Sequence, residues 1–234
     1  MKILAIDTSN EVLGIAMLSE KVIIGEYITN LKKNHSVRLM PAIEQFLSDC
    51  ETTPAEIDKI VVAQGPGSYT GVRIGVTVAK SLAWSLGIPL VGVSSLAVLA
   101  ATPRFFKGYI SPLFDARRGL IYTGLYRYNQ GILEAIRPDR NMLAVDWATE
   151  LKDLQEPVLF IGNDVPIHQE IFQSELLEFA HFAEVTECNP RPSELGKLGM
   201  DLPAEDIHSF TPNYIRLVEA EAKWLEKQER ENDE

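Results

Sequence analysis

A glycine-rich segment is the strongest candidate for chemistry in this sequence. It reads Gln64-Gly65-Pro66-Gly67-Ser68-Tyr69-Thr70-Gly71-Val72-Arg73-Ile74-Gly75 and lies between a predicted strand and a predicted helix. Such a loop offers backbone N–H groups to an anion, and the dipole of the following helix favours negative charge there. It is not a Walker A loop, because no Lys-Ser/Thr pair follows the glycines. The segment indicates either a phosphate contact or a tight turn from strand to helix.

A second candidate, Asp7-Thr8-Ser9, follows the first predicted strand. Ligands of α/β proteins commonly bind at the carboxyl ends of strands. The carboxylate could hold a metal ion or a water molecule and the hydroxyls could contact phosphate, or these side chains could only cap a hairpin turn. The candidate nucleotide or phosphate contacts are therefore Asp7, Thr8, Ser9, Gly65, Gly67, Ser68, Thr70, Gly71 and Arg73.

The histidines and cysteines indicate neither a metal site nor a covalent nucleophile. None has a second His or Cys at ligand spacing, and the sequence contains no Gly-x-Ser-x-Gly elbow. We therefore predict no metal site and no catalytic residue. The dispersed residues are His35, His168, His181, His208, Cys50 and Cys188.

Apolar periodicity predicts the elements that position these candidates. Short runs rich in Ile, Val and Leu predict strands, and steps of three and four residues predict helices. Their order predicts a three-layer α/β domain over residues 1–102, a smaller α/β domain over 103–212, and a C-terminal helix with an acidic tail over 213–234. The predicted strands are 2–6, 13–18, 22–27, 59–63, 89–93, 109–114, 121–128 and 158–161, and the helices are 34–50 and 70–86.

Each of the two predicted helices has a distinctive face. The apolar face of the first is expected to carry Val37, Met40, Ile43, Phe46 or Leu47, and Cys50. In the second helix, small residues recur every four positions, which allows another helix to approach closely. This small-residue stripe indicates either internal packing or a subunit interface. It consists of Gly71, Gly75, Ala79 and Ala83, beside Ile74, Val78 and Leu82.

Charge and composition limit the classes of function. The 234 residues carry a net charge of −11, which argues against binding RNA or DNA without another chain. There is no signal peptide and no run of about 18 apolar residues, so we expect a cytoplasmic protein without a membrane partner. Arg117 and Arg118 could contact tRNA or the carboxylates of a partner, or could simply form a hairpin turn.

Four motifs together resemble the TsaB family, also called YeaZ. They are Ile6-Asp7-Thr8-Ser9, the segment Gly65 to Gly75, Asp115-Ala116-Arg117-Arg118-Gly119, and Pro212-Asn213-Tyr214-Ile215-Arg216, and they span nearly the whole chain. The resemblance implies the two-domain fold of acetate and sugar kinases, heat-shock proteins and actin, in a shortened form. It also implies a role in making tRNA threonylcarbamoyladenosine.

The resemblance further implies a non-catalytic subunit that supports a catalytic paralogue, TsaD, together with an ATPase, TsaE. On this interpretation the chain contacts tRNA only as part of the complex. It has no cofactor of its own, and ATP or ADP could bind at the interface with the partner. Alone, the chain is expected to form a homodimer through the same two helices. The candidate interface residues are His35, Leu39, Ile43, Gly71, Gly75, Val78, Ala79 and Leu82.

The sequence departs from the catalytic paralogue in the first helix. The paralogue holds its metal with two histidines four residues apart, whereas here Leu39 stands four residues after His35. A single imidazole binds metal far more weakly than a chelating pair, so metal-dependent chemistry loses its basis. An independent ATPase or phosphotransferase using Asp7 and the Gly65 loop remains the alternative, and a metallopeptidase would require bound metal.

Overall fold

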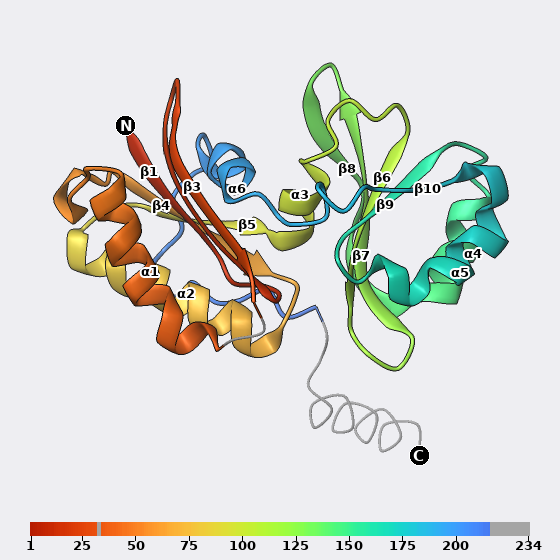
Figure 1. Ribbon diagram of the computed structural model, residues 1–234, viewed down its shortest axis with the longest axis horizontal. Coiled ribbons are helices and arrows are strands. Elements are labelled where there is room, and N and C mark those ends of the chain that lie inside the picture. Colours follow the sequence, from red (N-terminus) through yellow and green to blue (C-terminus); the bar gives the residue numbers. More distant parts are fainter. Residues whose placement is uncertain (32–33, 216–234) are drawn as a thin grey trace, which may run out of the picture.

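The computed structural model describes residues 1–31 and 34–215 of the chain. These residues form two five-stranded mixed sheets that lie side by side, each with helices against it (Figure 1). We call them the first lobe, with the sheet β3-β2-β1-β4-β5, and the second lobe, with the sheet β10-β9-β6-β7-β8. No helix within the described ranges is long and apolar enough to cross a membrane.

The predicted strands and the predicted helices 34–50 and 70–86 are confirmed, with shifted ends. In chain order, the first lobe begins with β1 (Lys2–Asp7), β2 (Val12–Ser19), β3 (Ile23–Asn30), α1 (His35–Asp49), a 3-10 helix (Pro54–Glu56), β4 (Lys59–Gly65), α2 (Tyr69–Leu86) and β5 (Leu90–Ser94). The chain continues with α3 (Ser95–Ala100), β6 (Tyr109–Asp115), β7 (Leu120–Asn129), β8 (Ile132–Leu143), α4 (Ala144–Lys152), β9 (Val158–Ile161), α5 (Val165–Leu176), a second 3-10 helix (Leu177–Phe179), β10 (Ala180–Phe182) and α6 (Pro192–Gly199).

The two sheets repeat one arrangement of strands. In each, the middle strand, β1 or β6, pairs antiparallel with the next strand along the chain and parallel with β4 or β9. Asp7 is the last residue of β1, and Asp115 is the last residue of β6. These two aspartates therefore occupy equivalent positions in the two lobes.

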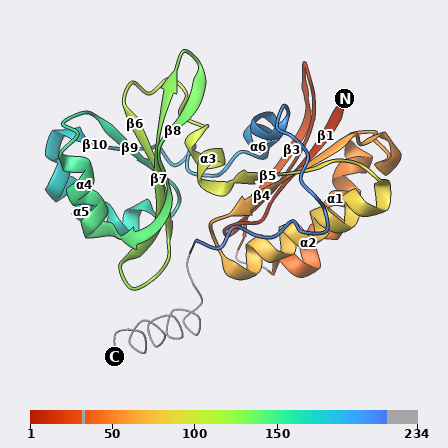
Figure 2. The same cartoon turned by 180° about the vertical axis from the view of Figure 1, so that it is seen from behind.

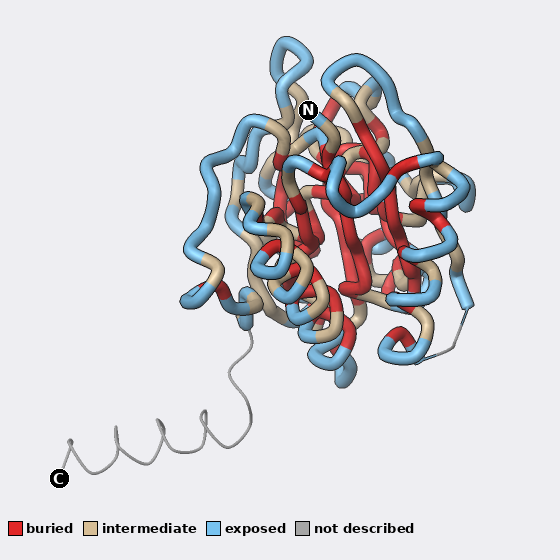
Figure 3. Tube along the Cα trace, turned by 90° about the vertical axis from the view of Figure 1, so that its left-hand side faces the viewer, coloured by how far each residue is buried: buried red, intermediate tan, exposed pale blue. Residues whose placement is uncertain are grey.

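Helices cover both faces of the first sheet, as the predicted three-layer domain requires. Alternate residues of β1 face opposite sides of the sheet. Leu4 and Ile6 pack with residues of α1 and α2, whereas Ile3 and Ala5 pack with Leu195 of α6. Figure 3 shows this buried centre of the sheets in red between exposed helices and loops.

The second sheet is covered by α4 and α5 on one face and by α3 on the other. Trp147 and Phe172 lie in the core under α4 and α5, and Leu96 and Leu99 of α3 pack against the opposite face. Because α3 contacts β4 and β5 of the first lobe and β6 and β7 of the second, it joins the two lobes.

The chain returns to the first lobe after β10, although the predicted boundaries placed residues up to 212 in the second domain. The backbone N–H of Glu205 donates to the carbonyl of Leu90 at 2.8 Å, and that of Asn213 donates to Gln64 at 2.8 Å. Figure 2 shows the segment after α6 running back along the first lobe. Local sequence patterns do not indicate which lobe a late helix joins. The rest of the predicted C-terminal helix and acidic tail, from residue 216 on, lies outside the described residues.

The buried face of α1 differs from the predicted one. Ile43, Phe46 and Leu47 are buried as expected, but Val37 and Met40 are 69% and 47% exposed. Leu39, at 1% exposure, packs into the core instead. The helix has apolar residues on more than one side, so periodicity alone did not select the face that packs on the sheet.

Candidate functional site

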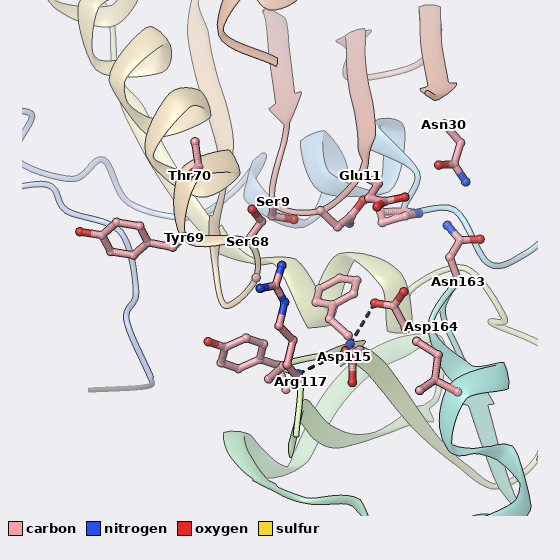
Figure 4. A pocket seen from close by; sticks show the side chains of 17 residues that line it. Ser9, Glu11, Asn30, Ser68, Tyr69, Thr70, Asp115, Arg117, Asn163 and Asp164 are labelled. Atoms are coloured by element: carbon pink, nitrogen blue, oxygen red, sulfur yellow. Dashed lines mark hydrogen bonds between the residues drawn. The ribbon is translucent and has the colours of Figure 1, made fainter. Parts of the chain in front are cut away.

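A cleft of about 990 Å³ lies between the lobes, where the carboxyl ends of their central strands meet. Ser9, Gly67 and Ser68 line it from the first lobe, and Asp115, Arg117 and Asp164 line it from the second. Figure 4 shows Arg117 extending from the second lobe toward Ser68, which caps α2. A ligand in this cleft would therefore touch both lobes.

The glycine-rich segment packs tightly against the end of β1. A Cβ atom on Gly67 would lie 2.1 Å from the carbonyl oxygen of Ser9, and one on Gly71 would lie 2.2 Å from that of Thr8. At Gly75 it would lie 2.5 Å from the Thr8 hydroxyl. No side chain fits at such distances, so close packing explains these three glycines without a ligand.

Hydrogen bonds lock the same two loops together. The Thr8 hydroxyl donates to the carbonyl of Gly71 at 2.8 Å, and the backbone N–H of Ser68 donates to the carbonyl of Ser9 at 2.7 Å. The Ser68 hydroxyl accepts from the N–H of Gly71 at 3.3 Å and so caps the helix. The start of α2 is thereby held in place, with Ser68 and Thr70 exposed toward the cleft.

Asp7 is sealed inside the first lobe. Its side chain is 2% exposed, and its Oδ1 atom accepts from the backbone N–H of Ser9 at 2.8 Å and from the Ser9 hydroxyl at 2.7 Å. Burial raises the pKa of Asp7, while the bonds from Ser9 and the nearby His35 lower it. The second carboxylate oxygen, Oδ2, is buried without a hydrogen-bond partner. The carboxylate therefore serves the turn and does not line the cleft.

The structure brings together only part of the predicted contact set. The candidates that line the cleft are Ser9, Gly67, Ser68 and Thr70. Arg73 instead places its guanidinium 2.7 Å from the Tyr69 hydroxyl and over the Tyr69 ring. The candidates that do not line it are Asp7, Thr8, Gly65, Gly71 and Arg73.

The second lobe supplies cleft residues that were not among the predicted contacts, although Asp115 belongs to one of the four motifs. His168 Nε2 lies 2.9 Å from Asp115 Oδ1, and the backbone N–H of Asp115 donates to Asp164 at 2.9 Å. Burial raises the pKa of Asp164, and the negative charges of Asp115 and Glu11 raise it further. The available signal was the equivalence of β1 and β6, which places Asp115 where Asp7 stands in the first lobe.

The turn that carries Arg117 has an unusual backbone. Arg117 and Arg118 have φ of 66° and 58°, in the left-handed region, and Gly119 follows with 77°. The N–H of Leu120 donates to the carbonyl of Arg117 at 3.1 Å, so the predicted alternative of a hairpin turn is present. Left-handed arginines are uncommon, and here they direct Arg117 into the cleft.

The predicted interface residues on α1 and α2 are mostly internal. His35, Leu39 and Ile43 are buried, as are Gly71, Gly75 and Ala79, because the small-residue stripe faces the sheet and the β1 turn. The interpretation of this stripe as internal packing therefore holds, and the stripe is not a surface. Val78 and Leu82 remain partly exposed, and Trp84 is 68% exposed.

Within residues 1–31 and 34–215, no three His, Cys, Asp or Glu side chains gather closely enough to hold a metal ion. His35 Nε2 lies 2.8 Å from the carbonyl of Asn10, to which it donates, and Leu39 is buried in the core. The position four residues after His35 therefore offers no second ligand.

Comparisons with known proteins identify the family. The family model described as TsaD, tRNA N6-adenosine threonylcarbamoyltransferase, matches residues 22–224. The tRNA threonylcarbamoyladenosine biosynthesis protein TsaB of Bacillus subtilis is 57% identical over 228 residues, 97% of this chain and 100% of that protein. This chain belongs to the TsaB family.

Other TsaB relatives and solved structures agree. TsaB of Escherichia coli is 32% identical over 132 residues, 56% of this chain and 57% of that protein. A Pseudomonas aeruginosa structure described as similar to peptidase YeaZ has a TM-score of 0.79 and 25% identity, covering 92% of this chain and 99% of that one. YeaZ of the same species has a TM-score of 0.75 and 24% identity, covering 91% and 99%. The predicted TsaB resemblance and two-domain actin-like α/β fold are confirmed.

Proposed function

We propose that this chain is a non-catalytic, cytoplasmic accessory subunit in the biosynthesis of tRNA threonylcarbamoyladenosine. The likeness to TsaB of Bacillus subtilis over nearly the full length of both chains carries this proposal. The likeness to the TsaD model supports a TsaD-like catalytic paralogue as the partner. A TsaE-like ATPase is the proposed third member, and tRNA is met through the complex.

The geometry of Asp7 supports the non-catalytic role. A carboxylate that is 2% exposed, and whose Oδ1 is held by Ser9, cannot reach a substrate in the cleft without the turn opening. The Asp7-dependent ATPase considered from the sequence would need this same carboxylate at the cleft. An accessory role requires no such rearrangement.

The outer sides of α1 and α2 are the proposed docking surface for the paralogue, and for a second copy when the chain is alone. Val37 and Met40 on α1 and Trp84 on α2 are large apolar side chains exposed to solvent, with Val78 and Leu82 partly exposed. Exposed apolar groups of this kind commonly mark protein interfaces. This surface replaces the buried small-residue stripe in our proposal.

Substitution at this surface tests the docking proposal. Val37→Asp and Trp84→Ala should each reduce co-purification with the paralogue at least tenfold, because they place a charge in the interface or remove an aromatic anchor. Ile132→Asp is the matched control, since Ile132 is 67% exposed on β8 of the second lobe. Equal co-purification of all three variants would refute the surface.

A nucleotide shared with the partner is the proposed occupant of the cleft. Ser9, Ser68 and Thr70 offer hydroxyl groups from one lobe, and Arg117 offers a cation from the other. Fluorescent ADP should bind the complex more tightly than either chain alone, and Arg117→Glu should weaken that binding. Unchanged binding in the variant would place the nucleotide elsewhere.

A reconstituted modification assay tests the function itself. It contains the paralogue, the ATPase, tRNA and preformed threonylcarbamoyl-adenylate, with or without this chain. Modification that appears only with this chain, while the isolated chain hydrolyses no ATP, is the expected result. Full modification in its absence would refute the accessory role and favour an independent ATPase.

A further inference from the structure

Asp139 is a carboxylate held between the two lobes. It lies on β8, and it accepts hydrogen bonds from the hydroxyl of Ser94 in the first lobe and from the hydroxyl of Tyr126 on β7. Tyr126 is 4% exposed and packs in the cluster that also contains Leu96 and Leu99 of α3. Asp139 therefore connects the outer strands of the second lobe to the junction of β5 and α3.

The local backbone is shaped to direct this carboxylate inward. The β7–β8 register shifts between Thr123 and Leu125, opposite the part of β8 that contains Asp139. Bulges of this kind redirect a side chain. Gly124 makes the room, because a Cβ atom there would lie 2.8 Å from Asp139 Oδ1. The register shift and Gly124 thus serve one contact.

The two arginines of β8 that lie near Asp139 in sequence pair with a different acid. Arg137 and Arg140 lie on the same strand but pair with Glu150 of α4, at 2.7 Å and 3.3 Å, and stack on Trp147. Burial raises the pKa of Asp139, although the bonds from Ser94 and Tyr126 lower it. Asp139 is therefore held by the hydroxyl groups of Ser94 and Tyr126, which link it to both lobes.

The contact continues from Ser94 to the glycine-rich segment. Ser94 caps α3 by accepting from the N–H of Ala97 at 3.1 Å while it donates to Asp139. Its neighbour Ser95, which is fully buried, accepts from the N–H of Gly65 at 3.1 Å. A path of hydrogen bonds and one peptide link therefore runs from β8 to the loop that borders the cleft.

We propose that Asp139 is a positioning residue that fixes α3, and through Ser95 the Gly65 loop, relative to the second lobe, and so sets the opening of the cleft. Ser94 and Tyr126 are the hydroxyl groups through which it acts. Removal of either the acid or the Ser94 hydroxyl should release the same constraint.

Two measurements on the full-length chain test this role. The first is hydrogen exchange of the Gly65 amide by NMR. The second is the distance between spin labels at exposed Glu44 on α1 and Gln173 on α5, with Cys50 and Cys188 replaced by serine. We expect Asp139→Asn and Ser94→Ala each to speed exchange at Gly65 at least tenfold and to broaden the distance distribution. Because Ser94→Ala also removes the cap on the N–H of Ala97, the double variant should do no more than Ser94→Ala alone.

The control is Asp146→Asn, which removes an exposed acid of α4 in the same lobe and should leave both measurements unchanged. If Asp139→Asn does not fold, Ser94→Ala and Tyr126→Phe give the same test with the acid retained. Slow exchange at Gly65 and an unchanged distance distribution in folded variants would overturn the proposal. So would effects of the two single changes that simply add in the double variant.

Discussion

Asp7 and Asp115 end equivalent strands of the two lobes, yet the two lobes use them differently. In the first lobe the glycine-rich segment closes over the β1 turn, and Asp7 becomes an internal acceptor for Ser9. In the second lobe Asp115 lines the cleft, with His168 behind it. The repeated strand order thus places both aspartates at the same position in the sheet, but the surrounding residues determine whether the carboxylate is buried or faces the cleft.

The largest expected effect comes from disturbing the close packing of the glycine-rich segment on the turn after β1. Gly67→Ala would place Cβ 2.1 Å from the backbone oxygen of Ser9, so the loop must move, and we expect a loss of about 3 kcal/mol in the free energy of unfolding. Gly119→Ala in the second lobe is the matched change. Its Cβ would meet nothing closer than 3.8 Å, and its φ of 77° costs only about 1 kcal/mol. Urea unfolding measures the free energy of unfolding of both variants. Equal losses would show that the glycine-rich segment is not closely packed on the β1 turn.

Neutralising the two aspartates should change stability in opposite directions. Asp115→Asn removes an acceptor needed by the N–H of Arg117 or by His168, and should cost about 1 kcal/mol. Asp7→Asn keeps an oxygen for Ser9, and at pH values above the raised pKa of Asp7 it removes a buried charge, so in that range it should stabilise the protein by about 1 kcal/mol. Two losses of similar size would mean that both lobes use the charge in the same way.

The smallest effect is the pH dependence of the Asp7 contribution. Burial raises the pKa of Asp7 above its ordinary value of 3.8, so the folded chain holds this proton more tightly than the unfolded chain. The stability from that proton is present below pH 3.8 and is lost as the pH rises through the raised pKa. The advantage of Asp7→Asn over the parent should therefore grow across this window and then level off. Asp146→Asn, at an exposed site, should give curves parallel to the parent, and parallel curves for Asp7→Asn would contradict the prediction.

Local sequence patterns were sufficient for the strands and long helices of the first lobe and for β6, β7 and β9, but they did not predict α3, β8, α4, α5, β10 or α6. Runs such as 2–6 and 59–63 have few alternatives to buried strands, and Gly87 and Pro89 end α2 where expected. The placement of α6 on the first sheet was not predictable in this way. It depends on contacts such as Glu26 with Ser193, whose N–H donates at 2.9 Å across more than 160 residues of sequence.

The candidate site was predicted only in part for the same reason. Ser9, Ser68 and Thr70 belong to motifs and do line the cleft, but nothing in a motif shows that Asp7 turns away from it. His168 was recognised only as an isolated histidine, because its partner Asp115 lies 53 positions earlier. The surface residues Val37 and Met40 were assigned to the core, since periodicity shows that a face is apolar without showing what covers it.

The return of α6 to the first lobe has a consequence for synthesis on the ribosome. One face of the first sheet is lined by Ile3, Ala5, Val61 and Ala63. Leu195 of α6 can cover this face only after nearly the whole chain has been made. The lobe that emerges first therefore cannot complete its core first, and its uncovered apolar face is open to wrong association while the second lobe is being synthesised. A nascent chain that stops before α6 is thus expected to need a chaperone more than the finished protein does.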